Sequence, residues 1–243
     1  MKNLLENYQP SQILDAIRTE KIKRAKSSLL PFIEHIYPQY LAGWIHEEVC
    51  EELEQFLIDV IEEKSPRLMV FIPPRHGKSF ISSENFPAWA LGKYPHLQCV
   101  ITSYGADLAG EFSMKAREIC KSEEYRSVFP SFEFGTKETT KDWNVKGRGG
   151  YRSTGIGGGL TGHGAHILVV DDPFKNHEDA YSPTKRQKAW DWFTSTAYTR
   201  IMPGGGCLIM QTRWHNDDLA GRVIRRMKED PTFERWKIVD YPA

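Results

Sequence analysis

A short apolar run that leads into a Gly-Lys-Ser turn constrains the fold of this chain more than any other feature. Leu68–Ile72 has the composition of a buried strand, and residues 73–80 then read Pro-Pro-Arg-His-Gly-Lys-Ser-Phe before a stretch that can be helical. This is the layout of a phosphate-binding loop, in which backbone N–H groups and a helix start surround phosphate oxygens. In such a loop Lys78 places its charge near the β- and γ-phosphates, and the Ser79 hydroxyl binds Mg²⁺. The motif predicts a site for a nucleoside triphosphate such as ATP.

The loop departs from the usual pattern at its start. Ile72 stands where G-x-x-x-x-G-K-S has its first glycine, and Pro73 and Pro74 have no N–H group to donate. We therefore expect the phosphate cradle to begin only after the prolines. The predicted nucleotide contacts are Arg75, His76, Gly77, Lys78, Ser79 and Phe80. Taken alone, Gly-Lys-Ser is also compatible with an ordinary surface turn.

A second motif is an apolar strand that ends in two carboxylates. Ile167–Val170 is followed by Asp171, Asp172 and Pro173. A carboxylate at the end of a strand beside the phosphate loop can hold Mg²⁺, which makes Asp171 the predicted ligand. Asp172 is the predicted group that orients or deprotonates the attacking water, although many ATPases have the longer Glu there. The alternative is a strand that ends in ordinary turn residues.

A third strand end carries polar residues of less certain meaning. Thr212 follows the predicted strand 207–211 and is placed to sense the γ-phosphate. Arg213 and His215 belong either to the same site or to a surface at a helix start. The glycine-rich segment 154–164 is read either as a structural turn or as a moving loop.

The residues after Thr212 also allow two structural interpretations. His215, Asp217 and Asp218 superficially resemble a metal-binding group. Helix capping explains the same residues, with Asn216 as the expected N-cap. We favour capping.

Strands and helices alternate along most of the chain. The expected strands are residues 68–72, 97–102, 167–170, 207–211 and 236–240, and the expected helices are 46–64, 78–91, 106–121, 216–228 and one that starts at Ser182-Pro183. This alternation predicts an α/β fold with a mostly parallel central sheet flanked by helices on both faces. Residues 122–165 are rich in Gly, Ser and aromatic residues, so short strands and loops are expected there.

Composition argues against several protein classes. No apolar run approaches the length that spans a bilayer, and the four cysteines are scattered without a Cys-x-x-Cys pair, so neither a membrane protein nor a disulfide or zinc framework is expected. The chain has 32 basic and 32 acidic residues and a formal net charge of zero. This balance counts mildly against nucleic-acid binding, and a DNA partner would require a local basic patch or several copies of the chain.

The order of these motifs closely resembles the large terminase subunits of tailed double-stranded DNA phages. The resemblance rests on residues 73–79, on Gly157–Gly162 leading to 171–173, and on Thr212–His215. It extends from about Pro38 to the C-terminus. Because several motifs occur in the same order, the combination is more specific than any one of them.

The resemblance implies an architecture and a set of partners. Residues 41–243 would form an ATPase domain of the additional-strand, conserved-glutamate (ASCE) P-loop class, residues 1–40 a helical extension, and the nuclease domain of the family is expected to be absent. Such subunits use ATP and Mg²⁺ to pump double-stranded DNA into a procapsid. They bind the portal protein and the small terminase subunit as a homo-oligomeric ring, a pentamer when assembled, whereas an isolated domain can be monomeric. The expected location is the host cytoplasm and, transiently, the portal vertex, but neither a membrane nor the mature virion.

The resemblance also assigns roles to single residues. Those that match the motor motifs are Lys78 (phosphate), Ser79 and Asp171 (Mg²⁺), Asp172 (catalytic acid) and Thr212 (coupling motif). Arg75 is similar to the arginine that these motors place inside the phosphate loop as a candidate finger for the γ-phosphate. His46 lies in the region that usually contacts adenine, although the common glutamine is not evident there. Which arginine reaches a neighbouring subunit stays open among Arg152, Arg200 and Arg213.

Two other functions compete with a packaging motor. A P-loop kinase for a small molecule would share the loop and the Mg²⁺ carboxylate, but would need an acceptor pocket and usually a lid with several arginines. A module that binds nucleotide only to build an assembly would show no phosphate release.

Overall fold

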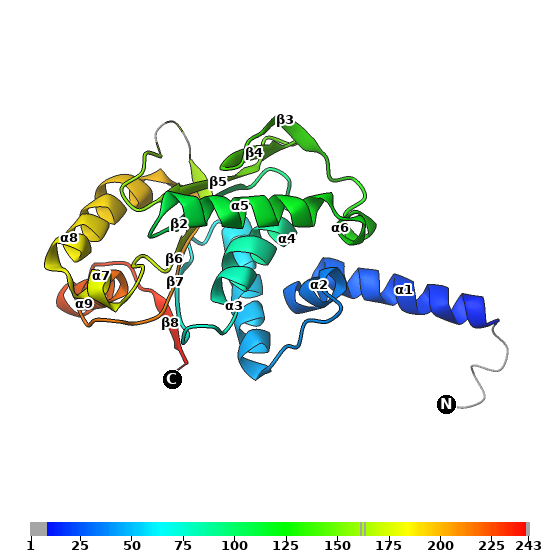
Figure 1. Cartoon of the computed structure of the whole chain (residues 1–243), viewed down its shortest axis with the longest axis horizontal. Coiled ribbons are helices and arrows are strands. Elements are labelled where there is room, and N and C mark those ends of the chain that lie inside the picture. Colours follow the sequence, from blue (N-terminus) through cyan, green and yellow to red (C-terminus); the bar gives the residue numbers. More distant parts are fainter. Residues whose placement is uncertain (1–8, 161, 163, 242–243) are drawn as a thin grey trace.

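A central sheet organises the computed structural model, which describes residues 9–160, 162 and 164–241. Its eight strands follow the order β3-β4-β5-β2-β6-β7-β1-β8 (Figure 1). The strands are β1 Arg67–Phe71, β2 Gln98–Ser103, β3 Phe134–Glu138, β4 Asp142–Val145, β5 Gly150–Gly155, β6 Ala165–Asp171, β7 Ile201–Gln211 and β8 Lys237–Asp240. Pairing is parallel from β5 through β2, β6, β7 and β1 to β8, and antiparallel among β3, β4 and β5. The predicted mostly parallel sheet is confirmed.

Helices cover both faces of this sheet (Figure 1). One face carries α2 Leu29–Ile36, α3 Trp44–Ile61, α4 Phe86–Lys93, α5 Ala106–Lys121 and α6 Glu123–Val128. The other face carries α7 His177–Tyr181, α8 Pro183–Trp192, the short segments η3 Phe193–Ala197 and η4 Tyr198–Arg200, and α9 Leu219–Glu229. This two-sided cover agrees with the sequence expectation.

The two cores follow from the alternation of side chains along buried strands. In β1, Leu68 and Val70 pack into the core with α3 and α5, whereas Met69 and Phe71 pack into the core with α8 and α9. Successive side chains of a strand point to opposite faces, so a strand covered on both sides must be apolar throughout. This is why the central strands read as continuous apolar runs rather than as alternating patterns.

Three segments differ from the sequence expectation. Strand β7 begins at Ile201 and not at Cys207. The helix after the phosphate loop contains a π-helical segment, η2 Phe80–Asn85, before it continues as α4. The predicted cap at Asn216 is wrong: α9 begins at Leu219, and the side chain of Asp218 accepts the N–H of Gly221 at 2.9 Å.

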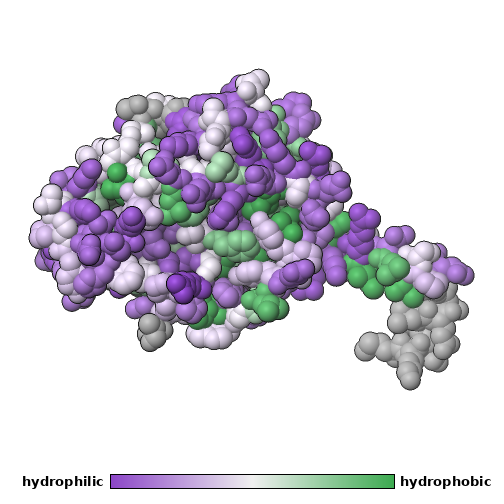
Figure 2. Space-filling view, in the orientation of Figure 1, coloured by the Kyte–Doolittle hydropathy of each residue, from purple (hydrophilic) through white to green (hydrophobic). Residues whose placement is uncertain are grey.

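The N-terminal helix α1 Pro10–Ser27 projects from the rest of the molecule (Figure 1). Only Ala25 of this helix is buried, and Leu14 and Ile17 are 66% and 49% exposed. The face shown in Figure 2 is otherwise mostly hydrophilic, with small separate apolar patches. In the described part of the chain, no helix combines the length and apolar character needed to cross a membrane.

Candidate functional site

Three neighbouring strand ends bring the sequence motifs to one edge of the sheet. Strand β7 lies between β1 and β6, and all three run in parallel. The phosphate loop follows β1, Thr212 follows β7, and Asp172 follows β6. The two halves of the predicted site therefore face each other across the end of β7. A ligand in this position would lie outside the carboxyl ends of the strands, where open α/β sheets bind their ligands.

The backbone of the loop turns through two left-handed residues. Gly77 has φ of 70°, which glycine adopts without steric cost, and Arg75 has φ of 65°, which is uncommon for a side-chain-bearing residue. The amide of Ile81 donates to the Gly77 carbonyl at 3.0 Å, so the helix begins directly after the loop with Lys78 and Ser79 in its first turn. The first N–H groups of a helix have no partner within the helix and favour anions.

Lys78 links the three strand ends. Its side chain is 6% exposed, and Nζ donates to the Pro73 carbonyl at 3.3 Å and to Thr212 Oγ1 at 2.9 Å. The same Nζ lies 3.6 Å from Asp172 Oδ2. Thr212 also donates its N–H to Asp172 Oδ1 at 2.9 Å and its hydroxyl to the Ile72 carbonyl at 3.1 Å. One ammonium, one carboxylate and one hydroxyl therefore form a single cluster.

Asp171 differs from its neighbour because it is fully buried. Its Oδ2 accepts the Ser83 hydroxyl at 2.7 Å, whereas Oδ1 has no partner at hydrogen-bonding geometry among the described residues. Burial, and then the charge of Asp172, raise the pKa of Asp171 to about 7, while the hydroxyls of Ser83 and Ser79 and the charge of Lys78 oppose the rise. An unpartnered buried carboxylate oxygen is costly unless it has a ligand.

These groups fit a Mg²⁺ ion. Mg²⁺ prefers oxygen ligands and binds proteins through one or two carboxylates. Asp171 supplies a free carboxylate oxygen, and Ser79 supplies a hydroxyl from the first turn of the helix. Asp172 is less suited to bind the ion directly, because its Oδ1 accepts the Thr212 N–H and its Oδ2 lies 3.6 Å from the Lys78 ammonium. Burial also raises the pKa of Asp172, and Lys78 is the main group that opposes the rise.

A pocket of about 350 Å³ opens beside this cluster. That volume lies within the usual range for small-molecule sites. Its lining contains most of the predicted residues, together with aromatic side chains that the motifs did not indicate. The lining residues are Pro74, Arg75, Gly77, Lys78, Ser79, Phe80, Tyr104, Leu108, Asp172, Phe174, Lys175, Thr212 and Trp214.

Two predicted nucleotide contacts do not line the pocket. His76 is exposed, and its Nδ1 lies 2.9 Å from the Pro74 carbonyl. His46 Nδ1 accepts the N–H of Gly43 at 2.9 Å, which places the ring at the start of α3. A Cβ built on Gly77 would lie 3.8 Å from His46 Nε2, so His46 does lie next to the loop. The predicted contact between His46 and adenine stays a prediction.

The three arginines proposed as trans-acting fingers have different surroundings. Arg152 Nε donates to Asp142 Oδ2 at 2.8 Å, at the antiparallel edge of the sheet. Arg213 Nε donates to Asp218 Oδ2 at 2.9 Å, and its guanidinium lies 4.9 Å from the centre of the Phe71 ring. Arg200 has a buried Nε with no partner among the described residues. Arg75, in contrast, is exposed and lines the pocket.

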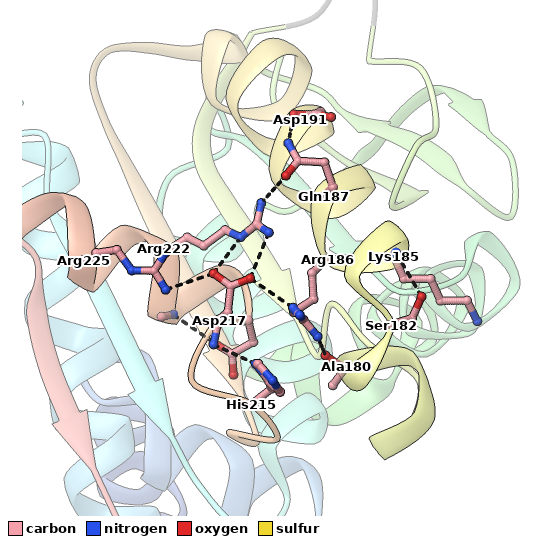
Figure 3. Close-up of polar contacts among 12 residues, drawn as sticks. Ala180, Ser182, Lys185, Arg186, Gln187, Asp191, His215, Asp217, Arg222 and Arg225 are labelled. Carbon is pink, nitrogen blue, oxygen red and sulfur yellow. Dashed lines mark hydrogen bonds and ion pairs between the residues drawn. The ribbon is translucent and has the colours of Figure 1, made fainter.

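The acidic pair after Thr212 forms ion pairs and a helix cap. Asp217 accepts hydrogen bonds from Arg186 of α8 and from Arg222 and Arg225 of α9 (Figure 3). Hydrogen bonds from Arg222 first, and also from Arg186 and Arg225, lower the pKa of Asp217 to about 2. No group of three or more potential metal ligands occurs within residues 9–160, 162 and 164–241.

The buried Asp218 connects the end of β7 with the start of α9. It caps α9, and its Oδ2 accepts from Gln211 Nε2 at 3.0 Å and from Arg213. The segment that begins at Thr212 is therefore fixed to α8 and α9 at its far end.

The glycine-rich segment 154–164 begins as the end of β5. Gly158 donates its N–H to the Gly155 carbonyl at 2.8 Å and accepts the indole N–H of Trp192 at 2.8 Å. These bonds describe a structural turn for the first part of the segment. Thr161 and His163 lie outside the described residues.

Sequence reasoning missed Ser83, the hydroxyl that holds Asp171. A serine inside a helix carries no functional signal by itself. Its spacing of four residues from Ser79 was the available signal, because residues i and i+4 share one face of a helix.

Comparison with known proteins adds a family and a fold. A family described as terminase large subunit, T4likevirus-type, N-terminal, matches residues 69–243. A search of curated proteins found no significant match.

Among solved structures, the large terminase of bacteriophage HK97 has a TM-score of 0.53 with 13% identity, over 90% of this chain and 43% of that chain. The large terminase of the thermophilic bacteriophage D6E in complex with ADP has a TM-score of 0.44 with 12% identity, over 77% of this chain and 44% of that one. A structure titled the Phi-28 gp11 DNA packaging motor has a TM-score of 0.41 with 11% identity, over 75% of this chain and 58% of that chain. The chain thus spans less than half the length of these two large terminases. The HK97 likeness supports an α/β fold with a mostly parallel central sheet.

Proposed function

The chain belongs to the T4-like type of terminase large subunits, matched over the N-terminal part of that family, and on this premise we propose that it is an ATP-hydrolysing motor domain that moves double-stranded DNA into a viral procapsid. The observation that carries the proposal is the cluster of Lys78, Asp172 and Thr212 in the lining of one pocket, with Lys78 Nζ 3.6 Å from the Asp172 carboxylate. A motor needs such a junction, because the group that binds phosphate must be linked to a group that can respond to its loss.

Binding of the triphosphate is assigned to the loop. The free N–H groups of the first helical turn and the Lys78 ammonium face the pocket and favour anionic oxygens. The exposed Arg75 extends the positive charge at the pocket rim. The neighbouring Phe80, Tyr104, Phe174 and Trp214 give the pocket an apolar wall.

Hydrolysis is assigned to the two carboxylates. Ser79 and Asp171 would hold Mg²⁺, which neutralises charge on the β- and γ-phosphates when bound. Asp172 keeps one oxygen on the Thr212 N–H, and its other oxygen would take the proton of the water that attacks the γ-phosphorus while the bond to the bridging oxygen breaks. Burial raises the pKa of Asp172, which brings a carboxylate base closer to its working pH.

Coupling is assigned to Thr212 and the residues that follow it. Thr212 contacts both halves of the site, and the same segment ends at Asp217 and Asp218, which are bound to α8 and α9. A change in the phosphate contacts of Lys78 and Asp172 would therefore reach the helices on one face of the sheet through one short segment.

The partners follow from family membership. We propose double-stranded DNA, the portal protein and the small terminase subunit as partners of a homo-oligomeric ring, in the host cytoplasm and transiently at the portal vertex. The trans-acting arginine is one of Arg152, Arg200 and Arg213, and of these Arg152 and Arg213 already have carboxylate partners within the chain.

The test is phosphate release from ATP, measured with and without double-stranded DNA. Lys78→Ala should abolish turnover, and Asp172→Asn should preserve nucleotide binding while turnover falls by several orders of magnitude. Lys146→Ala is the matched control, because Lys146 is exposed and its side chain forms an ion pair with Glu133 at 2.6 Å, away from the pocket lining. Turnover retained in Lys78→Ala would remove the loop from the chemistry. A requirement for a small acceptor would favour a kinase, and nucleotide binding without release under assembly conditions would favour an assembly module.

A further inference from the structure

The helix after the phosphate loop combines a π-helical segment, Phe80–Asn85, with a proline at position 87. In an α-helix the Ser83 carbonyl would accept the N–H of residue 87, but Pro87 has none. One residue earlier, the Phe86 N–H donates to the carbonyl of Ile81, five residues before it, which is the π-helical pattern. The Tyr151 hydroxyl of β5 donates to the freed Ser83 carbonyl at 2.8 Å. π-bulges inside α-helices frequently occur at functional sites.

This segment buries four consecutive polar residues. Ser82, Ser83, Glu84 and Asn85 are each at most 4% exposed. Three of them are bonded to the helix itself or to α5: Ser82 Oγ to the Lys78 carbonyl at 3.0 Å, Asn85 Nδ2 to the Phe80 carbonyl at 2.8 Å, and Glu84 to Lys115 at 3.0 Å. Ser83 alone of the four bonds to the site, through Asp171.

The hydrogen bond from Ser83 distinguishes the two oxygens of Asp171. Oδ2 accepts it at 2.7 Å, and Oδ1 is buried without a hydrogen-bond partner among the residues that the structure describes. Rotation of the carboxylate would break a hydrogen bond of a fully buried side chain, where an unmet acceptor is costly. The Ser83 hydroxyl therefore determines which oxygen is free.

We propose that Ser83 is a positioning residue for the metal site, which holds Asp171 by Oδ2 so that Oδ1 remains available to Mg²⁺. This inference rests on the proposed ATPase function. It adds a residue behind the carboxylate to the two direct ligands, Ser79 and Asp171. Groups that orient metal ligands in this way typically change metal affinity about 10- to 100-fold when they are removed.

A purely structural role makes a different prediction. If Ser83 only satisfies a buried carboxylate, its loss lowers the melting temperature but leaves the Mg²⁺ requirement of nucleotide binding unchanged. If it positions Asp171, the Mg²⁺ concentration that gives half of the metal-dependent gain in affinity rises, while affinity without metal does not change. Melting temperature is therefore not the deciding measurement.

The experiment is a calorimetric titration of ADP into the whole chain, first in EDTA and then over a series of Mg²⁺ concentrations. We expect Ser83→Ala to bind ADP in EDTA like the wild type and to need about 10-fold more Mg²⁺ for the half-maximal gain. Ser83→Cys, which keeps a donor at the same position but a larger and weaker one, should fall between the two. Ser113→Ala is the matched control: Ser113 is equally buried, but its hydroxyl contacts Trp143 on β4 at 3.2 Å.

The outcomes separate this inference from the proposed function. A wild-type Mg²⁺ requirement in Ser83→Ala overturns the inference and leaves the ATPase proposal intact. An equal loss of affinity with and without Mg²⁺ also overturns it, because the loop and not the metal site would then be disturbed. If Ser83→Ala does not fold, Ser83→Cys decides in the same way. Failure of the wild-type chain to bind ADP under either condition sinks the proposed function, and this inference with it.

Discussion

Asp217 offers the sharpest test of how the site is joined to its supporting helices. Its carboxylate accepts four hydrogen bonds: from Arg186 Nε at 3.1 Å, from Arg222 Nε at 3.2 Å and Nη2 at 3.0 Å, and from Arg225 Nη2 at 3.0 Å. Asp217→Asn keeps the size of the side chain. It removes the charge and turns an N–H₂ group toward at least one guanidinium. The perturbation is therefore electrostatic and not a packing defect.

The magnitude depends on which arginine is desolvated. The side chains of Arg186 and Arg222 are 10% and 16% exposed, whereas Arg225 is 53% exposed and contributes little. Breaking a fully buried ion pair costs about 3–5 kcal/mol. Because Asp217 itself is 23% exposed, we expect roughly 2–3 kcal/mol here. For a chain of this size that corresponds to a fall in melting temperature of roughly 5–10 °C.

The pH dependence provides an independent check with a defined sign. The pKa of Asp217 is lowered to about 2 in the folded chain, against about 3.9 when unfolded. A lowered folded pKa adds stability that is complete above the unfolded value and is lost as the pH falls through the folded value. The difference in unfolding free energy between wild type and Asp217→Asn should therefore be full at pH 5 and should decline toward pH 2.

Urea unfolding of both proteins between pH 2 and pH 7 measures this difference. Asp191→Asn is the matched control, because its carboxylate is exposed and accepts a single side-chain hydrogen bond, from Gln187 Nε2 at 2.7 Å. A difference below about 0.5 kcal/mol at pH 7 would refute the reasoning, because that is the range of ordinary surface substitutions. A difference that does not change with pH would show that charge is not its cause.

Three further outcomes follow from other contacts. Tyr151→Phe leaves the Ser83 carbonyl without its partner and should lower the unfolding free energy by about 1–2 kcal/mol, whereas an unchanged value would mean that water replaces the hydroxyl. Gly206→Ala should cost roughly 1–3 kcal/mol, because a Cβ there would lie 2.5 Å from the Phe56 ring; no loss in urea unfolding would show that the ring moves aside freely. The buried thiols should not react with an aromatic disulfide reagent at pH 8 in the folded chain, because burial raises their pKa values, and rapid colour release would contradict this. These thiols are Cys50, Cys99, Cys120 and Cys207.

Much of the fold could be predicted from the sequence. Strands covered on both faces are continuous apolar runs, and the helices that cover them have helical spacing of their apolar residues. The predicted helix 106–121 has the observed bounds of α5, and Ser182 caps α8 as expected. Strand β7 was predicted too short, because Gly204–Gly206 looks like a loop. Those glycines continue the strand, and at Gly206 the approach of Phe56 leaves no room for a Cβ. Packing of this kind depends on distant residues and has no local signal.

The candidate site likewise has a part that the sequence could predict and a part that it could not. Lys78, Asp172 and Thr212 could be placed together because each follows an apolar strand, and parallel strands share a carboxyl edge. His46 lies beside the loop, 3.8 Å from a Cβ built on Gly77, without lining the pocket. Of the aromatic wall, Phe80 and Trp214 lie within the motifs, whereas Tyr104 and Phe174 come from loops whose paths depend on the finished sheet. Motifs could not indicate these two.

Because β7 lies between β6 and β1, the sheet fixes the distance between the acidic strand end and the phosphate loop. The strands that precede these two segments are two hydrogen-bonded strand spacings apart, roughly 9–10 Å. The backbone hydrogen bonds of the sheet maintain this distance. Surface substitutions can therefore accumulate without altering the separation between the two backbone segments that flank the site. Thr212 follows the strand between them, where a bulkier side chain would reduce the space that the ligand can occupy.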